Sequence, residues 1–236
     1  MRGPLQIIAA LGVITSQVIV ACFPHAQSEQ HDWCSNKNKT TSLDLIIGGC
    51  TAVIQSGREN KQNLAIAFYN RGMVYFRKGD DDRAAKDFVQ AIRLDQKHAQ
   101  QILTLALALS IKKDNDRTVR YSGVVIEADS RNANALHVRG TAYHDKGQFD
   151  LAIADLNQAI KLNPKVAAFY FVRSNCYFAK KEFDRAIRDY DEVAKMNPKN
   201  SLALFARGVA KRSKGDIDGA DADIAAALSL DLKTTR

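Results

Sequence analysis

The chain contains 236 residues, of which 46% are hydrophobic and 25% are charged, with only 13 glycines and 4 prolines. This composition is typical of a globular protein and excludes a largely disordered chain, and the length allows a sizeable core. The formal net charge of +8 favours anionic partners. Because the basic residues are spread along the chain without a clustered patch, no nucleic acid partner is expected.

The N-terminal segment, residues 1–28, is predicted to be a secretory signal peptide. It contains a positive charge, then a long apolar run and a polar exit, which is the order typical of such leaders. We expect cleavage after Ala26 or Ser28, and therefore a periplasmic or secreted mature protein. Two alternatives stay open. One is an uncleaved leader that anchors the chain in a membrane, and the other is lipidation of Cys22, because the residues before it resemble a bacterial lipobox.

Residues 29–64 are predicted to form an N-terminal capping segment that contains one helix. The stretch DLIIGGCTAVIQSG, residues 44–57, has the pattern of half a repeat. Asp44 is expected to be the N-cap of this helix and Gly57 its stop.

Two cysteines of this segment, Cys34 and Cys50, are predicted to form a disulfide, because an exported chain meets an oxidising compartment. Closing so short a loop contributes about 3 kcal/mol in the chain-entropy model. The alternative is a cytosolic protein with two free thiols. Cys176 is expected to pack as a small hydrophobic residue.

The rest of the chain repeats with a period of 34 residues. GQFDLAIADLNQAIKLNP, which begins at residue 147, returns as KEFDRAIRDYDEVAKMNP one period later. A fixed period of this length is typical of stacked repeats, because one unit cannot bury its own apolar face. The five windows are 65–98, 99–132, 133–166, 167–200 and 201–234.

Small residues occupy two places of every window and predict a helix hairpin. At one height on two antiparallel helices, small side chains let the backbones approach closely. The eighth place holds Gly72, Ala106, Gly140, Ser174 and Gly208, and the twentieth holds Ala84, Thr118, Ala152, Ala186 and Ala220.

An aspartate occupies the eighteenth place of every window, just before an apolar helical pattern. Such a residue accepts the free N–H groups of a first helical turn, so the second helix of each hairpin is predicted to start there. The second window has lost most of the other marks and is predicted to be a degenerate repeat. The five aspartates are Asp82, Asp116, Asp150, Asp184 and Asp218.

These windows resemble the tetratricopeptide repeat (TPR) family, whose 34-residue pattern has the same small, aromatic and proline positions. The resemblance covers residues 65–234. Lys211 and Leu232 depart from the pattern in the fifth window, which is expected to be an atypical terminal repeat. The resemblance implies an all-α fold, a superhelical solenoid of about five helix hairpins.

Arginine and aspartate recur at the seventh and twenty-third places of every window except the second. We predict an arginine–carboxylate pair with a structural role, either within a hairpin or between neighbouring hairpins. The alternative is a set of separate, solvated charges. The arginines are Arg71, Arg139, Arg173 and Arg207, and the aspartates are Asp87, Asp155, Asp189 and Asp223.

The resemblance also implies a partner-binding groove, lined by the first helix of each hairpin. The groove places are spaced by three and four residues and share one helical stripe. Aromatic residues at these places suit an amphipathic or extended peptide. Alternatively, they pack against neighbouring helices or a chain terminus. The expected groove residues are Tyr69, Met73, Phe76, Arg77, His137, Thr141, His144, Phe171, Asn175, Phe178, Phe205, Val209 and Arg212.

The sequence carries no metalloprotease, P-loop or serine hydrolase motif. His137 and His144 lie two helical turns apart, about 10.5 Å by helical rise, which is too far for one metal ion. No catalysis, metal or cofactor is therefore expected. We predict a protein-protein interaction scaffold of the bacterial cell envelope that binds a protein or peptide and meets anionic envelope components. The alternatives are a lipid-anchored adaptor for cell-wall enzymes and an enzyme that uses the His137 region.

Overall fold

The structure is a computed structural model that describes residues 23–35 and 42–234. These residues form twelve helices and no strand, and none of the helices is long and apolar enough to cross a membrane. The chain divides into two compact units, residues 1–98 and residues 99–236. Most of the expected signal peptide, with Cys22, lies outside the described residues.

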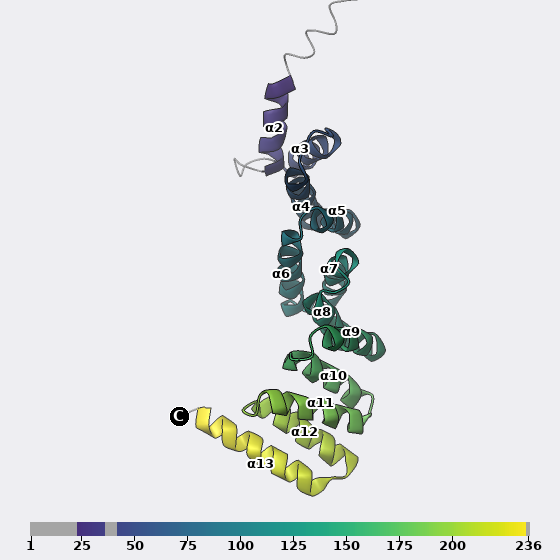
Figure 1. Ribbon diagram of the computed structural model, residues 1–236, viewed down its shortest axis with the longest axis vertical. Helices are drawn as coiled ribbons and strands as arrows, with labels where there is room; N and C mark the ends of the chain where they lie inside the picture. Colours follow the sequence, from purple (N-terminus) through teal and green to yellow (C-terminus); the bar gives the residue numbers. More distant parts are fainter. Residues whose placement is uncertain (1–22, 36–41, 235–236) are drawn as a thin grey trace, which may run out of the picture. The chain divides into compact units, whose positions relative to one another are not determined.

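Unit 1 begins with two helices where the sequence predicted one. The additional helix, α2, packs against α3 as the first half of a hairpin and also contacts α4 (Figure 1). Because α2 begins at Phe23, it includes the two expected cleavage positions. The helices of unit 1 are α2 (Phe23–Ser35), α3 (Leu43–Gln55), α4 (Lys61–Arg77) and α5 (Asp81–Leu94).

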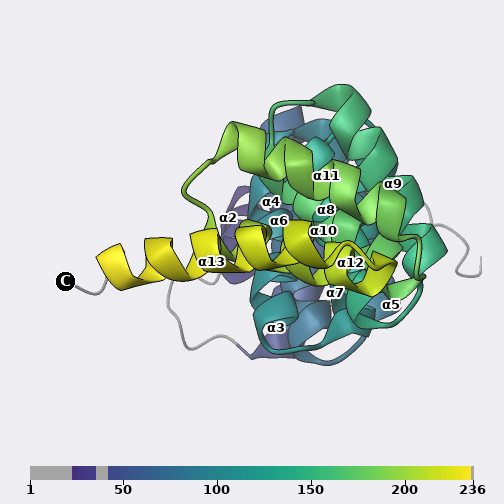
Figure 2. The ribbon, with the colours of Figure 1, turned by 90° about the horizontal axis from the view of Figure 1, so that it is seen from below.

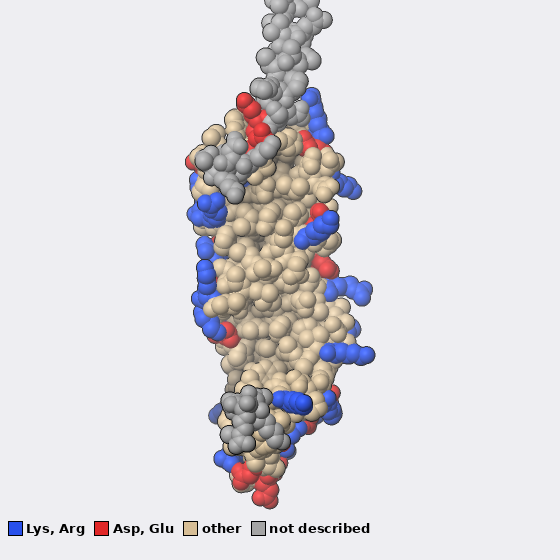
Figure 3. All heavy atoms as spheres, turned by 90° about the vertical axis from the view of Figure 1, so that its left-hand side faces the viewer, with Lys and Arg blue, Asp and Glu red and all other residues tan. Residues whose placement is uncertain are grey.

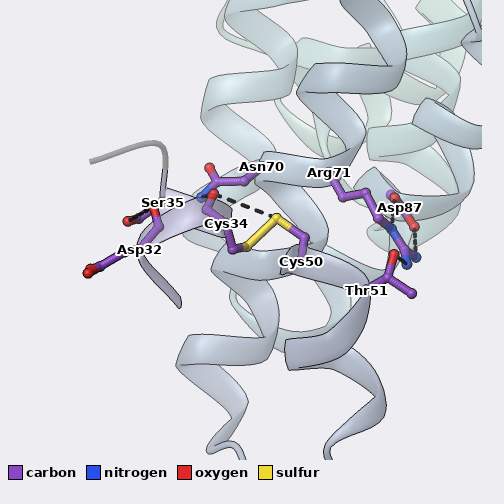
Figure 4. Close-up of a disulfide and its surroundings, with 8 residues drawn as sticks. All are labelled: Asp32, Cys34, Ser35, Cys50, Thr51, Asn70, Arg71 and Asp87. Atoms are coloured by element: carbon purple, nitrogen blue, oxygen red, sulfur yellow. Dashed lines mark hydrogen bonds and ion pairs between the residues drawn. A yellow bond between two sulfur atoms is a disulfide. The ribbon is translucent and has the colours of Figure 1, made fainter. Parts of the chain in front are cut away.

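A disulfide and a close helix contact join α2 to α3. The structure links Cys34 to Cys50, with Cα atoms 4.5 Å apart (Figure 4). A Cβ atom at Gly49 would lie 2.8 Å from Gln30 O, so only glycine allows this approach. Asn70 Nδ2 on α4 donates to Cys34 O at 3.0 Å. The oxidation state of the two cysteines in the purified protein stays a prediction.

The expected N-cap of α3 is wrong by two residues. Ser42 caps this helix, because its Oγ accepts from Leu45 N at 3.3 Å. Asp44 lies within the first turn and accepts from Lys78 Nζ at 2.6 Å. The expected stop of this helix is confirmed. Gly57, two residues after the last residue of α3, adopts a positive φ of 64°.

Unit 2 contains four consecutive helix hairpins. The first of them, α6 with α7, corresponds to the second window of the sequence repeat. Each helix from α7 onward packs on the next one along the chain. Figure 2 shows α13 crossing the end of this stack, with its C-terminal part extending past its neighbours. The helices are α6 (Lys97–Ile111), α7 (Asn115–Ala128), α8 (Ala133–Asp145), α9 (Phe149–Leu162), α10 (Ala167–Ala179), α11 (Phe183–Met196), α12 (Ser201–Lys214) and α13 (Ile217–Thr234).

The small residues at the eighth and twentieth places lie where the two helices of a hairpin touch. A Cβ atom at Gly72 would lie 2.7 Å from the ring of Phe88, and one at Gly208 would lie 3.0 Å from Ala220 O. At Gly140 the nearest atom, Leu156 Cγ, would be 3.1 Å away. The tight contacts explain why glycine or another small residue recurs at this place.

The predicted caps of the second helices are also wrong by two residues. The capping position is the sixteenth place, where Asp80 and Asp114 accept from backbone N–H groups at 3.1 Å and 3.2 Å. Asp216 does the same in the last hairpin at 3.0 Å. The aspartates of the eighteenth place lie two residues further along, within the first turn, where they still complement the helix dipole.

Those first-turn aspartates instead bind lysines of the following hairpin, a role that the sequence analysis did not include. Lys214 Nζ lies 2.6 Å from Asp184, and the ammonium lowers the pKa of that carboxyl. A lysine occupies the fourteenth place of all five windows. The other described pairs in unit 2 are Lys146 with Asp116 and Lys180 with Asp150.

The arginine–aspartate pairs form within each hairpin. Arg139 donates from Nε and Nη2 to the two carboxylate oxygens of Asp155, both at 2.8 Å. This hydrogen bonding raises the pKa of Arg139 against the opposing effect of burial. The same geometry joins Arg71 to Asp87, Arg173 to Asp189 and Arg207 to Asp223.

Three of these arginines also reach the preceding hairpin, where Arg71 Nη1 donates to Thr51 Oγ1 at 2.9 Å (Figure 4). Arg173 Nη1 donates to Asn157 Oδ1 at 2.6 Å, and Arg207 Nη1 donates to Asp191 Oδ1 at 2.7 Å. The corresponding place before Arg139 is Gly123, which has no side chain to accept. Each such arginine therefore links three helices through one planar, multidentate cation.

A residue in the left-handed region ends the first helix of every repeat hairpin. This fifteenth place turns the chain toward the second helix and favours glycine, which has no Cβ to clash. Two windows carry lysine there despite the strain. The residues and their φ angles are Gly79 (77°), Lys113 (61°), Gly147 (72°), Lys181 (61°) and Gly215 (100°).

Mutation of the Arg139–Asp155 pair should show strong coupling. In a double-mutant cycle with alanine substitutions, measured by urea unfolding, we expect a coupling energy of about 1 to 3 kcal/mol, because the bidentate pair is partly buried. The pair Arg139 and Asp189 should show none, since Asp189 is bound by Arg173. Equal coupling in the two cycles would contradict the assignment within the hairpin.

Replacement of Lys181 by glycine should stabilise the protein. Relief of the left-handed strain is worth about 1 kcal/mol, part of which is offset because glycine gains entropy in the unfolded chain. Gly147→Ala is the matched control and should lower the unfolding free energy. A Lys181→Gly variant that melts below the parent protein would argue against the strained turn.

Candidate partner-binding surface

The expected groove residues of unit 1 lie on α4 and are mostly engaged in packing. Tyr69 stacks on His98 with ring centroids 4.8 Å apart and lies 5.9 Å from the ring of Phe88. Burial raises the pKa of Tyr69. Met73 and Phe76 are half-buried, and of the expected groove residues on this helix only Arg77 is exposed. Unit 1 therefore offers little free surface at these places.

On α8 the polar groove residues have partners within unit 2. His137 is half-buried against the Phe169 ring, 5.1 Å between centroids, and burial lowers its pKa. Thr141 Oγ1 donates to the carbonyl oxygen of His137 at 2.9 Å. His144 Nδ1 lies 3.2 Å from Asp145 Oδ1. The described residues include no group of three or more histidine, cysteine or acidic side chains placed to hold a metal ion.

The aromatic groove residues of α10 pack against α11, the second helix of the same hairpin. Phe171 meets Tyr190 edge-on at 5.9 Å, and Phe178 lies 5.6 Å from Phe183. Asn175 Oδ1 accepts from the Tyr190 hydroxyl at 2.6 Å. These side chains are half-buried, so packing against neighbouring helices accounts for much of their apolar surface.

Larger exposed apolar side chains lie on the first helices at the two ends of unit 2. On α12, Leu202 is 60% exposed and Phe205 is 46% exposed, while Val209 is half-buried and Arg212 donates to Asp221.

On α6, Leu107 is 43% exposed and Ile111 is 83% exposed. No groove residues were expected on this helix, because the second window is degenerate. Leu107 and Ile111 occupy the ninth and thirteenth places, so counting those places through the second window would have found them.

We define the first-helix face of unit 2 as the residues at the groove places of its four first helices. Figure 3 shows one side of the molecule, where lysine and arginine side chains stand mostly along the margins. Exposed apolar side chains gathered on one face are typical of a protein interaction site. The residues of this face are Leu107, Ile111, His137, Thr141, His144, Phe171, Asn175, Phe178, Leu202, Phe205, Val209 and Arg212.

The repeated, closely packed hairpins define a helical-repeat protein of the solenoid type. Family models described as tetratricopeptide repeats match residues 65–98, 137–192 and 179–231. The matches cover 34 residues and 95 residues, 129 of 236 in total. The chain therefore belongs to the TPR family.

Solved structures show the same fold at low sequence identity. One crystal structure of MamA is 24% identical, has a TM-score of 0.57, and aligns over 70% of this chain and 96% of that chain. MamA from Desulfovibrio magneticus RS-1 is 17% identical with a TM-score of 0.57, over 72% and 96%. YrrB is 20% identical with a TM-score of 0.56, over 77% and 91%. No curated protein sequence matches the chain.

Two aromatic positions of this face, Phe178 and Phe205, should respond differently to a negative charge. Phe178→Glu should destabilise unit 2 by about 2 to 4 kcal/mol, because it removes a packed ring and buries part of a carboxylate. Phe205→Glu should change the unfolding free energy by less than about 1 kcal/mol, since Phe205 is 46% exposed and its new carboxylate can reach water. Thermal and urea unfolding followed by circular dichroism measure both. Equal losses would show that Phe205 is also part of the core.

Proposed function

We propose that the protein is a non-enzymatic interaction scaffold of the bacterial cell envelope, and that it holds a peptide or protein segment on the first-helix face of unit 2. The observation that carries this proposal is the exposure of Leu107, Ile111, Leu202 and Phe205 at groove places. Exposed apolar anchors on one helical face suit the apolar side chains of a bound segment.

Other features support binding over chemistry. His137 is covered by Phe169, and His144 is directed to Asp145, so the two histidines make separate contacts instead of sharing a site. Cys176 is fully buried, and burial raises the pKa of its thiol to about 12, which makes it a poor nucleophile. YrrB, a structural neighbour, is described as a TPR protein with an unusual peptide-binding site, which supports a peptide as the partner.

The proposed envelope location rests on the leader and the cysteines. Residues 1–28 have the charge, apolar run and polar exit of a signal peptide. The placement of Cys34 against Cys50 fits a chain that matures in an oxidising compartment. Lipidation of Cys22 would make the protein a membrane-bound adaptor with the same binding surface.

Site-specific photo-crosslinking in cells tests the binding surface. A benzoylphenylalanine at position 205 should capture a discrete partner, whereas the same residue at position 151 should not. Leu151 is the matched control because it is also exposed and apolar but lies on α9, a second helix.

The captured segment should then bind the purified protein with measurable affinity. The double variant Leu202→Glu/Phe205→Glu should weaken that affinity at least about tenfold, because two apolar contacts are lost, while its melting temperature stays near that of the parent protein. Undiminished binding by this folded variant, or equal capture at positions 151 and 205, would exclude the first-helix face.

Mass spectrometry of the protein purified from its own host tests the location. We expect a mature N-terminus at Gln27 or Glu29 and two cysteines that resist alkylation until a reductant is added. A lipid mass on Cys22 would select the anchored adaptor. An intact Met1 together with four free thiols, alkylated in the unfolded chain without any reductant, would contradict export.

A further inference from the structure

Two exposed lysines of unit 2 occupy equivalent turns, and neither has an anionic partner. Each ends an Asn-Pro-Lys sequence that joins one hairpin to the next, at residues 163–165 and 197–199. We call these the Asn-Pro-Lys turns. The side chains of Lys165 and Lys199 are exposed, and neither ammonium group forms a hydrogen bond or an ion pair with a described residue. Both charges are therefore available to a partner.

Hydrogen bonds fix the backbone of the two turns although the ammonium groups are free. Asn163 Oδ1 accepts from Lys165 N at 3.4 Å, and Asn197 Oδ1 accepts from Lys199 N at 3.3 Å. The Tyr170 hydroxyl also donates to the carbonyl oxygen of Pro164 at 3.2 Å. A partner that binds here orders only the lysine side chains and not the turns, which lowers the entropic cost of binding.

Both turns lead directly into the first-helix face of unit 2. Lys165 precedes α10 and Lys199 precedes α12. Three residues after each lysine is the second place of the window, which holds Ala168 and Leu202, and both are exposed. Leu202, at 60% exposure, is one of the apolar anchors of the proposed function. A segment that covers Leu202 therefore passes beside Lys199.

The opposite ends of the first helices differ, because carboxylates accompany their lysines. Lys113 Nζ donates to Asp145 Oδ2 at 3.0 Å, and Lys214 Nζ lies 2.6 Å from Asp184 Oδ1. These positive charges are offset within the protein. An anionic segment therefore gains less at that margin than at the Asn-Pro-Lys turns.

No carboxylate in the nearby sequence offsets the two Asn-Pro-Lys turns. Residues 162–170 and 196–207 contain no aspartate or glutamate. The turn before α8 is different, because Asp129 accompanies Arg131 there and its Oδ1 accepts from Arg131 N at 3.0 Å. The uncompensated positive charge of this margin therefore belongs to the last two inter-hairpin turns.

The spacing of the two lysines selects a spacing of acidic residues. The lysines are one hairpin apart, and the first helices of consecutive hairpins can lie in contact, as α8 and α10 do. Packed helix axes are about 8 to 10 Å apart. An extended chain rises about 3.3 Å per residue, so three residues span about 10 Å. Acidic side chains three residues apart can therefore meet both lysines at once.

We propose that Lys165 and Lys199 bind two acidic side chains of the segment held on the first-helix face, and that these residues lie three apart in an extended chain. The path of the segment over Leu202 rests on the proposed function, whereas the binding of carboxylates by the two lysines does not. The partner is therefore an acidic peptide segment with apolar anchors.

Calorimetric titration of the full mature chain with designed peptides tests this proposal. The spaced probe, LFESGESGELF, has apolar residues at both ends and glutamates three residues apart. The glutamine probe, LFQSGQSGQLF, has no charge, and the clustered probe, LFEEESGSGLF, has the composition of the spaced one. We expect the spaced probe to bind at least about fivefold more tightly than either control, because two exposed ion pairs form. High salt should reduce this preference.

Two double variants locate the charges that the probe uses. Lys165→Gln/Lys199→Gln should reduce the affinity for the spaced probe to that for the glutamine probe, and should leave the latter unchanged. Lys112→Gln/Lys181→Gln is the matched control, because it removes two exposed lysines from the opposite ends of first helices, and it should keep the preference. Melting temperatures confirm that each variant is folded.

The outcomes separate the two lysines from the first-helix face. Equal binding of the spaced and glutamine probes, no binding of any probe, or the same loss in both lysine variants would overturn this inference. Phosphatidylglycerol vesicles that bind through Lys165 and Lys199, with no preference among the peptides, would assign these lysines to a lipid surface instead. A lysine-dependent preference that persists when Leu202→Glu/Phe205→Glu leaves the affinity for the glutamine probe unchanged would support the lysine site and exclude the apolar face.

Discussion

The close approach of two helices within each hairpin is the constraint on which the rest of the structure depends. At Gly72 and Gly208 the partner helix comes so near that a single Cβ atom would collide with it. This proximity lets the short reach of an aspartate meet an arginine sixteen residues earlier in the chain. The pair then fixes the rotation of one helix against the other, because a bidentate contact tolerates little misalignment.

This construction decides which surfaces remain for a partner. Phe171 and Phe178 occupy positions that were expected to line a groove. Their rings instead pack in the hairpin core, against Tyr190 and Phe183. At the groove places of unit 2, the most exposed apolar side chains lie instead on α6 and α12. A segment that docks here gains most from anchors toward its two ends and from polar contacts between them, where histidine and asparagine are already ordered by their neighbours.

The period of the sequence was sufficient to predict the hairpins, because small residues at fixed places reflect a local packing rule. The caps were misplaced, since Asp80 and Asp82 are equally good capping residues and only the turn geometry chooses between them. The sequence could not reveal helix α2. Its apolar residues define a helical face only weakly, and its first residues belong to the expected leader. A cavity lined by Lys113, His144 and Ala179 is built from three successive hairpins, and a pattern within one window carries no such information.

The burial of Cys176 has a consequence for redox chemistry. Exchange between a thiol and a disulfide proceeds through the thiolate, and with a pKa of about 12 only about one Cys176 in a hundred thousand is ionised at pH 7. Its sulfur is also shielded from solvent. In the folded chain, Cys176 is therefore a poor competitor for thiol–disulfide exchange with Cys34 and Cys50.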